Sequence, residues 1–128
     1  MQFIKHHQTI KPTGYIYKIQ AIDKSINDFY IGSTFLSLDQ RMQTYKSEYK
    51  RGLKKKLFDC MNKHGGIQNF EYLLIDTIQS DNRNELIDLE REWQLKLKPT
   101  LNTNVAGGSD KNRKRILKRR SKNEQSNE

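Results

Sequence analysis

The sequence predicts a single small α/β (α+β) domain, with a mainly antiparallel three-stranded sheet flanked by helices in the order ββααβα. The chain has 128 residues, enough for one compact domain and hardly for two. Residues 15–33 follow a hairpin pattern, and the segments after them show helical periodicity or one compact apolar run. Hydrophobic residues make up 34% of the chain, so the core is modest, and a short sheet covered by helices is the economical way to bury it.

The first two strands are expected to pair as a hairpin. Residues 15–22 alternate with β-branched and aromatic side chains, the segment "DKSIND" breaks the pattern, and "FYIGS" (29–33) resumes it. The run "FEYLLIDTI" (70–78) is apolar and compact, which predicts a third strand that is buried.

Two helices are expected between the second and third strands. In the first, residues 36–50, four large side chains recur at helical spacing: Leu38, Met42, Tyr45 and Tyr49. Arg41 lies at the rim of that stripe, where a guanidinium can form a forked contact with a phosphate or with a carboxylate. The second helix, residues 53–64, is expected to end at Gly65 and Gly66, which supply a left-handed stop.

The last helix, expected over residues 81–97, has Ser80 or Asp81 as its candidate N-cap and Pro99 beyond its end. Its apolar face includes a carboxylate. At about 100° per residue, Glu90 falls among apolar residues, namely Leu86, Leu89, Trp93 and Leu97. The other acids fall on the opposite side, where solvent is expected: Glu85, Asp88 and Glu92.

A carboxylate on an apolar face costs several kcal/mol unless it is paired, hydrogen-bonded or bound to a cation. We therefore expect Glu90 to point towards the core or towards a cleft at its edge. Two interpretations follow from this position: a structural salt bridge to Arg41 or to a lysine, or a functional site.

The net charge of +9 is concentrated at the C-terminal end. Residues 111–128 hold eight of the 24 Lys and Arg residues but two of the 15 acidic ones. Such a polycation binds phosphate backbones by releasing counterions. The candidate nucleic-acid-binding residues are Lys111, Arg113, Lys114, Arg115, Lys118, Arg119 and Arg120. A solubilising end and, in a eukaryotic cell, a nuclear localisation signal are the alternative interpretations.

The remaining composition favours an intracellular, soluble protein. The single cysteine, Cys60, excludes an internal disulfide and is expected to be a small buried apolar residue. No apolar run approaches the roughly 18 residues of a membrane span, and the N-terminus lacks the apolar core of a signal peptide. His6 and His7 lack partners at metal-ligand spacing and are interpreted as part of a mobile end.

Five positions form an ordered set of motifs. Tyr17 stands in "YIYKI", Tyr30 in "YIGST", and Arg41 in "LDQRM" on the following helix. Glu90 precedes by nine residues the proline of a Pro-x-x-Asn that ends in Asn102, in "LEREWQLKLKPTLN". In order and in position, this set resembles the motifs of the GIY-YIG nuclease superfamily. The resemblance covers residues 14–104, which leaves 1–13 as an N-terminal extension and 105–128 as a basic tail expected to be flexible.

The resemblance implies a metal-dependent endonuclease that hydrolyses one phosphodiester bond per active site, in DNA by preference and in RNA as a further option. It assigns Glu90 as the sole protein ligand of Mg²⁺, with Mn²⁺ as a substitute, and Arg41 as the group that holds the phosphate. Tyr17 becomes the candidate general base, and Tyr30 the donor of a hydrogen bond to water or phosphate. Asn102 would anchor the loop after the helix or orient a phosphate.

The sequence departs from the family pattern at three places. Tyr15 replaces the glycine of the first motif, with Gly14 one place earlier, and one extra residue separates "YIGST" from the arginine. Where many members have a histidine one turn after the arginine, this chain has Tyr45, which leaves open the group that acts as proximal acid or base. A phenol has a pKa near 10, so the pKa of Tyr17 must fall if it is to act as a base at neutral pH. Tyr45 and Lys46 are second-tier candidates.

Two other functions are compatible with the sequence. One is a non-catalytic nucleic-acid-binding module on the same fold, and the other is a general RNA-binding protein with exposed aromatic platforms. The chain leaves no room for a second folded domain to read a sequence. We therefore expect specificity either to be low or to be supplied by a dimer or a partner protein. A double-strand break would require a dimer or two sequential events.

Overall fold

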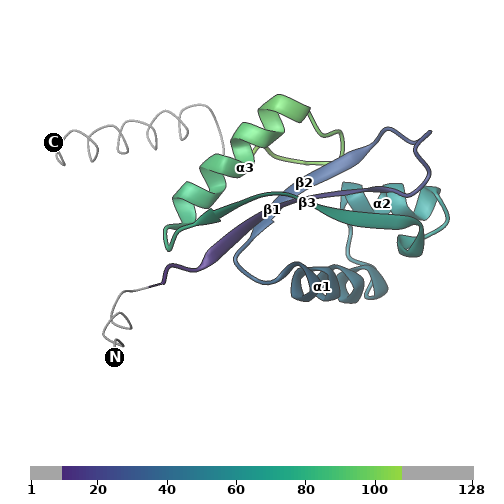
Figure 1. Ribbon diagram of the computed structural model, residues 1–128. Helices are drawn as coiled ribbons and strands as arrows, with labels where there is room; N and C mark the ends of the chain where they lie inside the picture. The colour runs from purple at the N-terminus through teal and green to yellow at the C-terminus, as the bar shows by residue number, and fades with distance from the viewer. Residues whose placement is uncertain (1–9, 108–128) are drawn as a thin grey trace, which may run out of the picture.

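The computed structural model describes residues 10–107; the two N-terminal histidines and the seven predicted tail residues lie outside this range. The elements are the strands β1 (Thr13–Ala21), β2 (Phe29–Thr34) and β3 (Phe70–Gln79), the helices α1 (Leu38–Lys50), α2 (Lys56–Lys63) and α3 (Arg83–Leu97), and the 3-10 turn η2 (Ile67–Asn69) (Figure 1). The predicted α/β class and the order ββααβα are confirmed. None of these helices is long and apolar enough to cross a membrane.

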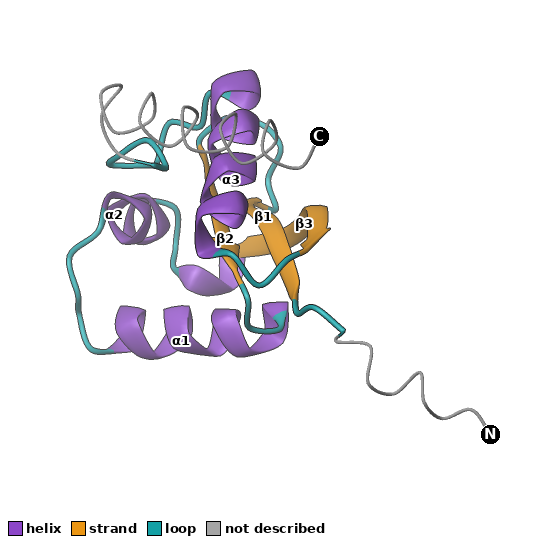
Figure 2. Ribbon diagram, turned by 90° about the vertical axis from the view of Figure 1, so that its left-hand side faces the viewer, coloured by secondary structure: helices purple, strands orange, loops and turns teal. Residues whose placement is uncertain are grey.

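The sheet has the strand order β2-β1-β3, and both pairings are antiparallel. The predicted hairpin forms, with Tyr17 opposite Gly32 and Ile19 opposite Tyr30. Successive residues of a strand point to opposite faces, so the side chains of Ile16 and Tyr17 are buried in two different hydrophobic clusters. Ile16 packs with Ile31 and with α3 on one face, whereas Tyr17 packs with α1 and α2 on the other (Figures 1 and 2).

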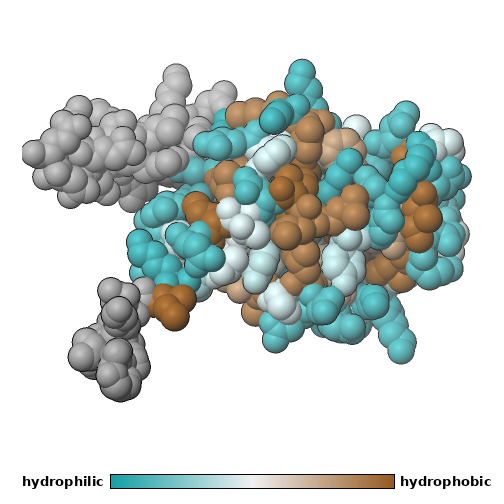
Figure 3. All heavy atoms as spheres, in the orientation of Figure 1, coloured by the Kyte–Doolittle hydropathy of each residue, from teal (hydrophilic) through white to brown (hydrophobic). Residues whose placement is uncertain are grey.

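The prediction that the third strand is buried is wrong. β3 pairs with β1 alone and forms an edge of the sheet, and Tyr72, Leu73 and Leu74 are 38%, 42% and 53% exposed. A compact apolar run predicts burial on both faces, which applies to a central strand of a covered sheet. In this small sheet β1 takes the central place, and three short helices do not cover the edge. Figure 3 shows apolar residues reaching the surface in the middle of the face on which β3 lies.

The ends of the helices follow from their capping residues. Ser37 caps α1 in a capping box with Gln40, and Gly65 and Gly66 adopt φ values of 93° and 116° after α2, as the stop signal predicts. The N-cap of α3 is Asn82, whose side chain accepts a hydrogen bond from Asn84 N, rather than Ser80 or Asp81. All three residues are cap formers, so the sequence pattern alone does not distinguish them.

The predicted exposure of the acids on α3 is correct for Glu92 and wrong for Asp88, which is 1% exposed. The helical wheel assumes one buried side. Here the chain after α3 returns along the helix and contacts it at Ala106. Arg91 Nη1 donates to the carbonyl of Ala106 at 3.1 Å, and the N–H of Ala106 donates to Gln94 Oε1 at 2.7 Å. A second side of α3 is therefore covered, which a two-sided wheel cannot anticipate.

Candidate active site

Three tyrosines from different elements meet on the α1 side of the sheet. Tyr17 comes from β1, Tyr30 from β2 and Tyr45 from α1, and their ring centroids lie 6.2–6.4 Å apart. The hydroxyls of Tyr17 and Tyr45 share a hydrogen bond of 2.7 Å. Tyr17 is 1% exposed and Tyr45 is 2% exposed, so this bond is shielded from bulk water.

Arg41 holds the hydroxyl pair from the adjacent turn of α1. Its Nε donates to Tyr17 Oη and its Nη2 donates to Tyr45 Oη, both at 3.3 Å. The guanidinium also lies 4.3 Å above the centroid of the Tyr45 ring, a cation–π arrangement. These contacts fix a positive charge beside two phenolic oxygens, whereas the sequence suggested a contact of Arg41 with a phosphate or a carboxylate.

Burial governs the protonation of these phenols. It raises the pKa of Tyr17 to about 12, and the neighbouring Tyr30 adds to this, while the hydrogen bonds from Tyr45 and Arg41 and the charge of Arg41 act in the opposite direction. Burial also raises the pKa of Tyr45. Both hydroxyls are therefore protonated at neutral pH, and Arg41 alone does not produce the lowered pKa that a base at Tyr17 needs.

Gly32 provides the space in which the Tyr17 ring lies. A Cβ at position 32 would lie 2.5 Å from Tyr17 Oη and 2.6 Å from its Cζ, closer than real Cβ contacts. The Tyr17 ring is packed between the sheet and α1, so it cannot move aside cheaply. The glycine of "YIGST" is required by this close approach of a ring to the backbone of β2.

We expect Gly32→Ala to destabilise the fold by about 1–3 kcal/mol, the usual range for overpacking a core. Urea unfolding followed by circular dichroism measures this change. Ser47→Ala, on the exposed side of α1, adds no atoms and is the control for steric effects. A Gly32→Ala protein as stable as the wild type would show that the Tyr17 ring can shift to accommodate the added Cβ without a cost in stability.

Glu90 is half-buried and is held by two neutral donors. Ser33 Oγ donates to Glu90 Oε1, and Gln94 Nε2 donates to Glu90 Oε2 at 2.8 Å. Burial raises the pKa of the Glu90 carboxyl, and the hydrogen bond from Ser33 and the charge of Arg83 offset this only in part. The wheel correctly predicted that Glu90 turns inward. Its hydrogen bonds come from Ser33 and Gln94, where the structural interpretation expected an ion pair with Arg41 or a lysine.

Asn102 joins the loop after α3 to the free edge of β2. Its Oδ1 accepts from Ile31 N at 2.9 Å and its Nδ2 donates to Ile31 O at 2.7 Å, so both halves of the amide are used. Next to it, Leu101 N donates to Phe29 O at 3.0 Å. Of the two predicted roles of Asn102, the structure supports the anchoring one.

Asn102→Asp is expected to destabilise the protein by about 1–3 kcal/mol, because a carboxylate oxygen would then face the carbonyl of Ile31 without a hydrogen. Thermal unfolding at neutral pH checks this. Asn104→Asp, two residues further along an exposed stretch, adds the same charge at a side chain that makes no hydrogen bond to β2. Equal losses in the two variants would attribute the effect to added charge in the loop and contradict the anchoring role.

Several of these residues line a cleft of about 280 Å³. It is lined by Tyr30, Tyr45, Lys55, Lys56, Leu57, Glu90, Leu101, Asn102, Thr103 and Asn104. The cleft thus contains the predicted carboxylate, two of the phenols and the predicted amide, whereas Tyr17 and Arg41 lie beneath it against Tyr45. Lys46, a second-tier candidate, lines a different cavity with Met42 and Phe70.

Several residues of the site were missed at the level of sequence. Ser33 and Gln94 hold Glu90, and Lys55 and Lys56 at the start of α2 line the cleft. The run "LKKKL" was a visible signal for the lysines, since a cluster of cations is suited to a phosphate backbone. Nothing in the spacing of Ser33 or Gln94 distinguishes them from ordinary polar residues.

Comparison with known families defines the class of protein to which this fold and site correspond. The model of the GIY-YIG catalytic domain matches residues 13–103, most of the chain. The chain belongs to the GIY-YIG family. Members of the family are generally endonucleases that use a divalent metal ion, and their substrates are nucleic acids. Neither the curated proteins nor the solved structures provided a match.

Proposed function

We propose that this chain is a metal-dependent endonuclease that hydrolyses phosphodiester bonds in DNA, one strand per active site. The observation that carries the proposal is the cleft in which the half-buried carboxylate of Glu90 lies with Tyr30 and Tyr45, above the pair formed by Tyr17 and Arg41. A carboxylate and phenolic hydroxyls in one cleft, with a guanidinium directly behind them, are the groups needed to bind a cation, a water molecule and a phosphate.

Glu90 fits a magnesium ion. Mg²⁺ keeps most of its waters and is commonly held by one or two carboxylates together with phosphate oxygens. The donors to Glu90 are neutral and burial raises the pKa of its carboxyl, so a cation would stabilise the ionised form. When bound, such an ion polarises the phosphoryl oxygen and stabilises the leaving oxygen. Mn²⁺, which also prefers oxygen ligands, is the expected substitute.

The remaining steps fall to side chains of the chain itself. Arg41 offsets negative charge on the phosphate as the transition state forms. Tyr17 acts as the base in its ionised form: the Tyr45 hydroxyl, which lines the cleft, passes its proton to the Tyr17 oxygen and takes one from the attacking water. Tyr30, on the wall of the cleft, orients the water or the phosphate. Gln94 and Ser33 position Glu90.

Lys56 is expected to contact the backbone of the nucleic acid beside the cleft. Lys56→Gln should weaken DNA binding independently of sequence and reduce the slope of log K against log[salt] by about 1. Fluorescence anisotropy over a range of salt concentrations measures both. Lys63→Gln, at the other end of α2, does not line the cleft and is the matched control. Identical slopes for the two variants would remove Lys56 from the interface.

The reaction is tested with labelled substrates of different shape. We expect the protein with Mg²⁺ to cut at least one of supercoiled, nicked, flapped and branched DNA, and to convert supercoiled plasmid to open circles before linear product appears. RNA versions of the same substrates decide between DNA and RNA. Binding to all of these substrates without cleavage of any would instead identify a non-catalytic nucleic-acid-binding module.

A further inference from the structure

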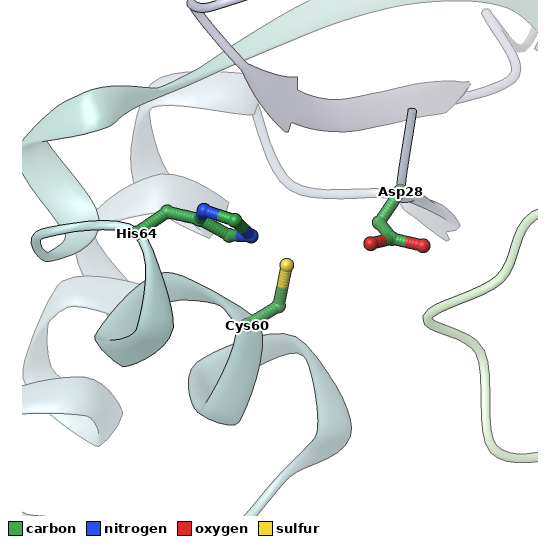
Figure 4. Close-up of side chains that lie close together, drawn as sticks. All are labelled: Asp28, Cys60 and His64. Carbon is green, nitrogen blue, oxygen red and sulfur yellow. The ribbon is translucent and has the colours of Figure 1, made fainter. Parts of the chain in front are cut away.

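We propose that Asp28, Cys60 and His64 form a second metal site, suited to Zn²⁺ and separate from Glu90. One ligand atom of each residue lies within 4.8 Å of those of the other two, and Figure 4 shows the three side chains pointing towards one another. None of the three lines the cleft that contains Glu90. The site goes beyond the proposed nuclease function, since nothing in that function requires it.

The positions of the three residues follow from the fold. Cys60 lies in α2 and His64 is the C-cap of that helix. Because they are four residues apart, their side chains lie on the same face. Asp28 stands immediately before β2, next to this face. The Cys60–x–x–x–His64 spacing is thus completed by a residue that is distant in sequence, which is why the sequence did not reveal it.

The donor set selects the kind of ion. A thiolate, an imidazole and a carboxylate together suit Zn²⁺, whereas Mg²⁺ prefers oxygen ligands alone. In a tetrahedral zinc site, bonds of about 2.0–2.3 Å place the ligand atoms roughly 3.5 Å apart. Side chains that already lie within 4.8 Å of one another reach this spacing by shifts on the order of 1 Å. Water is left to fill the fourth position.

The surroundings are consistent with binding of a cation. The Cys60 thiol is largely shielded from solvent, and a carboxylate and an imidazole lie beside it. His64 also lines a cavity of about 430 Å³ together with Asp23. Because binding requires a thiolate and a neutral imidazole, zinc affinity should fall as the solution is acidified.

A metal at this place would connect α2 to the strand that forms the active site. Asp28 Oδ1 accepts a hydrogen bond from Thr100 Oγ1 at 2.8 Å, and the chain immediately after Thr100 pairs with β2. The ion would therefore tie together α2, the start of β2 and the loop that contains Asn102. We assign it a structural role, fixing the helix whose first residue, Lys56, flanks the cleft.

The test is titration of the full-length, metal-free, reduced protein with Co²⁺, which reports thiolate ligation through a sulfur-to-metal charge-transfer band in the near ultraviolet. We expect one Co²⁺ per chain with this band, its displacement by one equivalent of Zn²⁺, and a higher Tm with Zn²⁺. Cys60→Ser should remove the band, and Asp28→Asn, which can still accept from Thr100, should weaken binding roughly 10-fold or more.

Two controls separate this site from others in the chain. The double variant His6→Gln/His7→Gln should bind Co²⁺ as the wild type does, which excludes the N-terminal histidines. Glu90→Gln should also bind Co²⁺ with the band unchanged, so that the outcome is independent of nuclease activity. Absence of a charge-transfer band in the wild type overturns the proposal. A band that survives in Asp28→Asn with undiminished affinity also overturns the three-residue site.

Discussion

Replacing Glu90 with glutamine should lower the rate of DNA cleavage by at least about 10³-fold while leaving DNA binding intact, because a neutral amide is a poor ligand for Mg²⁺. The amide introduced there can still accept from Gln94 and donate to the hydroxyl of Ser33, so the surroundings of the side chain are retained. Single-turnover cleavage and anisotropy measure the two properties. Glu92→Gln, two residues along the same helix and exposed, is the matched control.

The same substitution should make the protein more stable at neutral pH. Burial raises the pKa of Glu90 in the folded state, so the ionised carboxylate opposes folding above that pKa. Protonated Glu90 therefore does not oppose folding below the pKa that this carboxyl has in the unfolded chain. Its penalty appears as the pH rises through the higher pKa of the folded state. In the absence of metal, the Tm of Glu90→Gln should therefore exceed that of the wild type at pH 7, and the gap should narrow towards pH 4.

A gap in Tm that is the same at pH 4 and pH 7 would contradict the raised pKa. Added Mg²⁺ provides an independent check, because it should raise the Tm of the wild type and leave that of Glu90→Gln unchanged. Together these measurements show whether the Glu90 carboxylate binds a cation or has only a structural role.

Cleavage by the wild type should accelerate about tenfold per pH unit from pH 7 to pH 9, if Tyr17 acts as the base. With a pKa of about 12, only the small ionised fraction of Tyr17 takes a proton, and this fraction grows with pH up to that value. Tyr17→Phe should lower the rate by about 10²–10⁴-fold and abolish this slope. Rates measured with saturating Mg²⁺ at each pH check both expectations.

Tyr49→Phe is the matched control, since its exposed hydroxyl bonds to Asn62 away from the cluster. It should leave both the rate and the slope unchanged. A Tyr17→Phe protein that is slow but keeps the tenfold slope would assign the proton transfer to another group. Tyr45 would then be the first candidate, because its hydroxyl shares a hydrogen bond with Tyr17.

Short-range sequence patterns correctly predicted the features of the fold that depend on neighbouring residues alone. Alternation specified the hairpin, helical spacing specified the buried stripe of α1, and Gly65 and Gly66 specified the end of α2. The position of Glu90 was predictable for the same reason, because the face of a helix depends on spacing alone. Motif order then supplied the family, which the match over residues 13–103 confirms.

The rest depends on contacts between elements far apart in the chain. β3 was misjudged because an apolar run does not reveal that β1 takes the central place in the sheet. The burial of Asp88 on the side predicted to face solvent, and the contacts of Arg91 and Gln94 with the chain that returns after the helix, follow from no local pattern. The donors to Glu90 come from β2 and from one turn further along α3, and the pKa of Tyr17 depends on how deeply three elements enclose it.

The most direct test of the central claim is cleavage of supercoiled, flapped and branched DNA by the wild-type protein with Mg²⁺, set beside the same reactions with EDTA. The account predicts cleavage of at least one substrate with Mg²⁺, one strand at a time, and none with EDTA. Cleavage that persists in EDTA would contradict the assignment of Glu90 as a metal ligand. Binding without cleavage of any DNA or RNA substrate would contradict the nuclease itself.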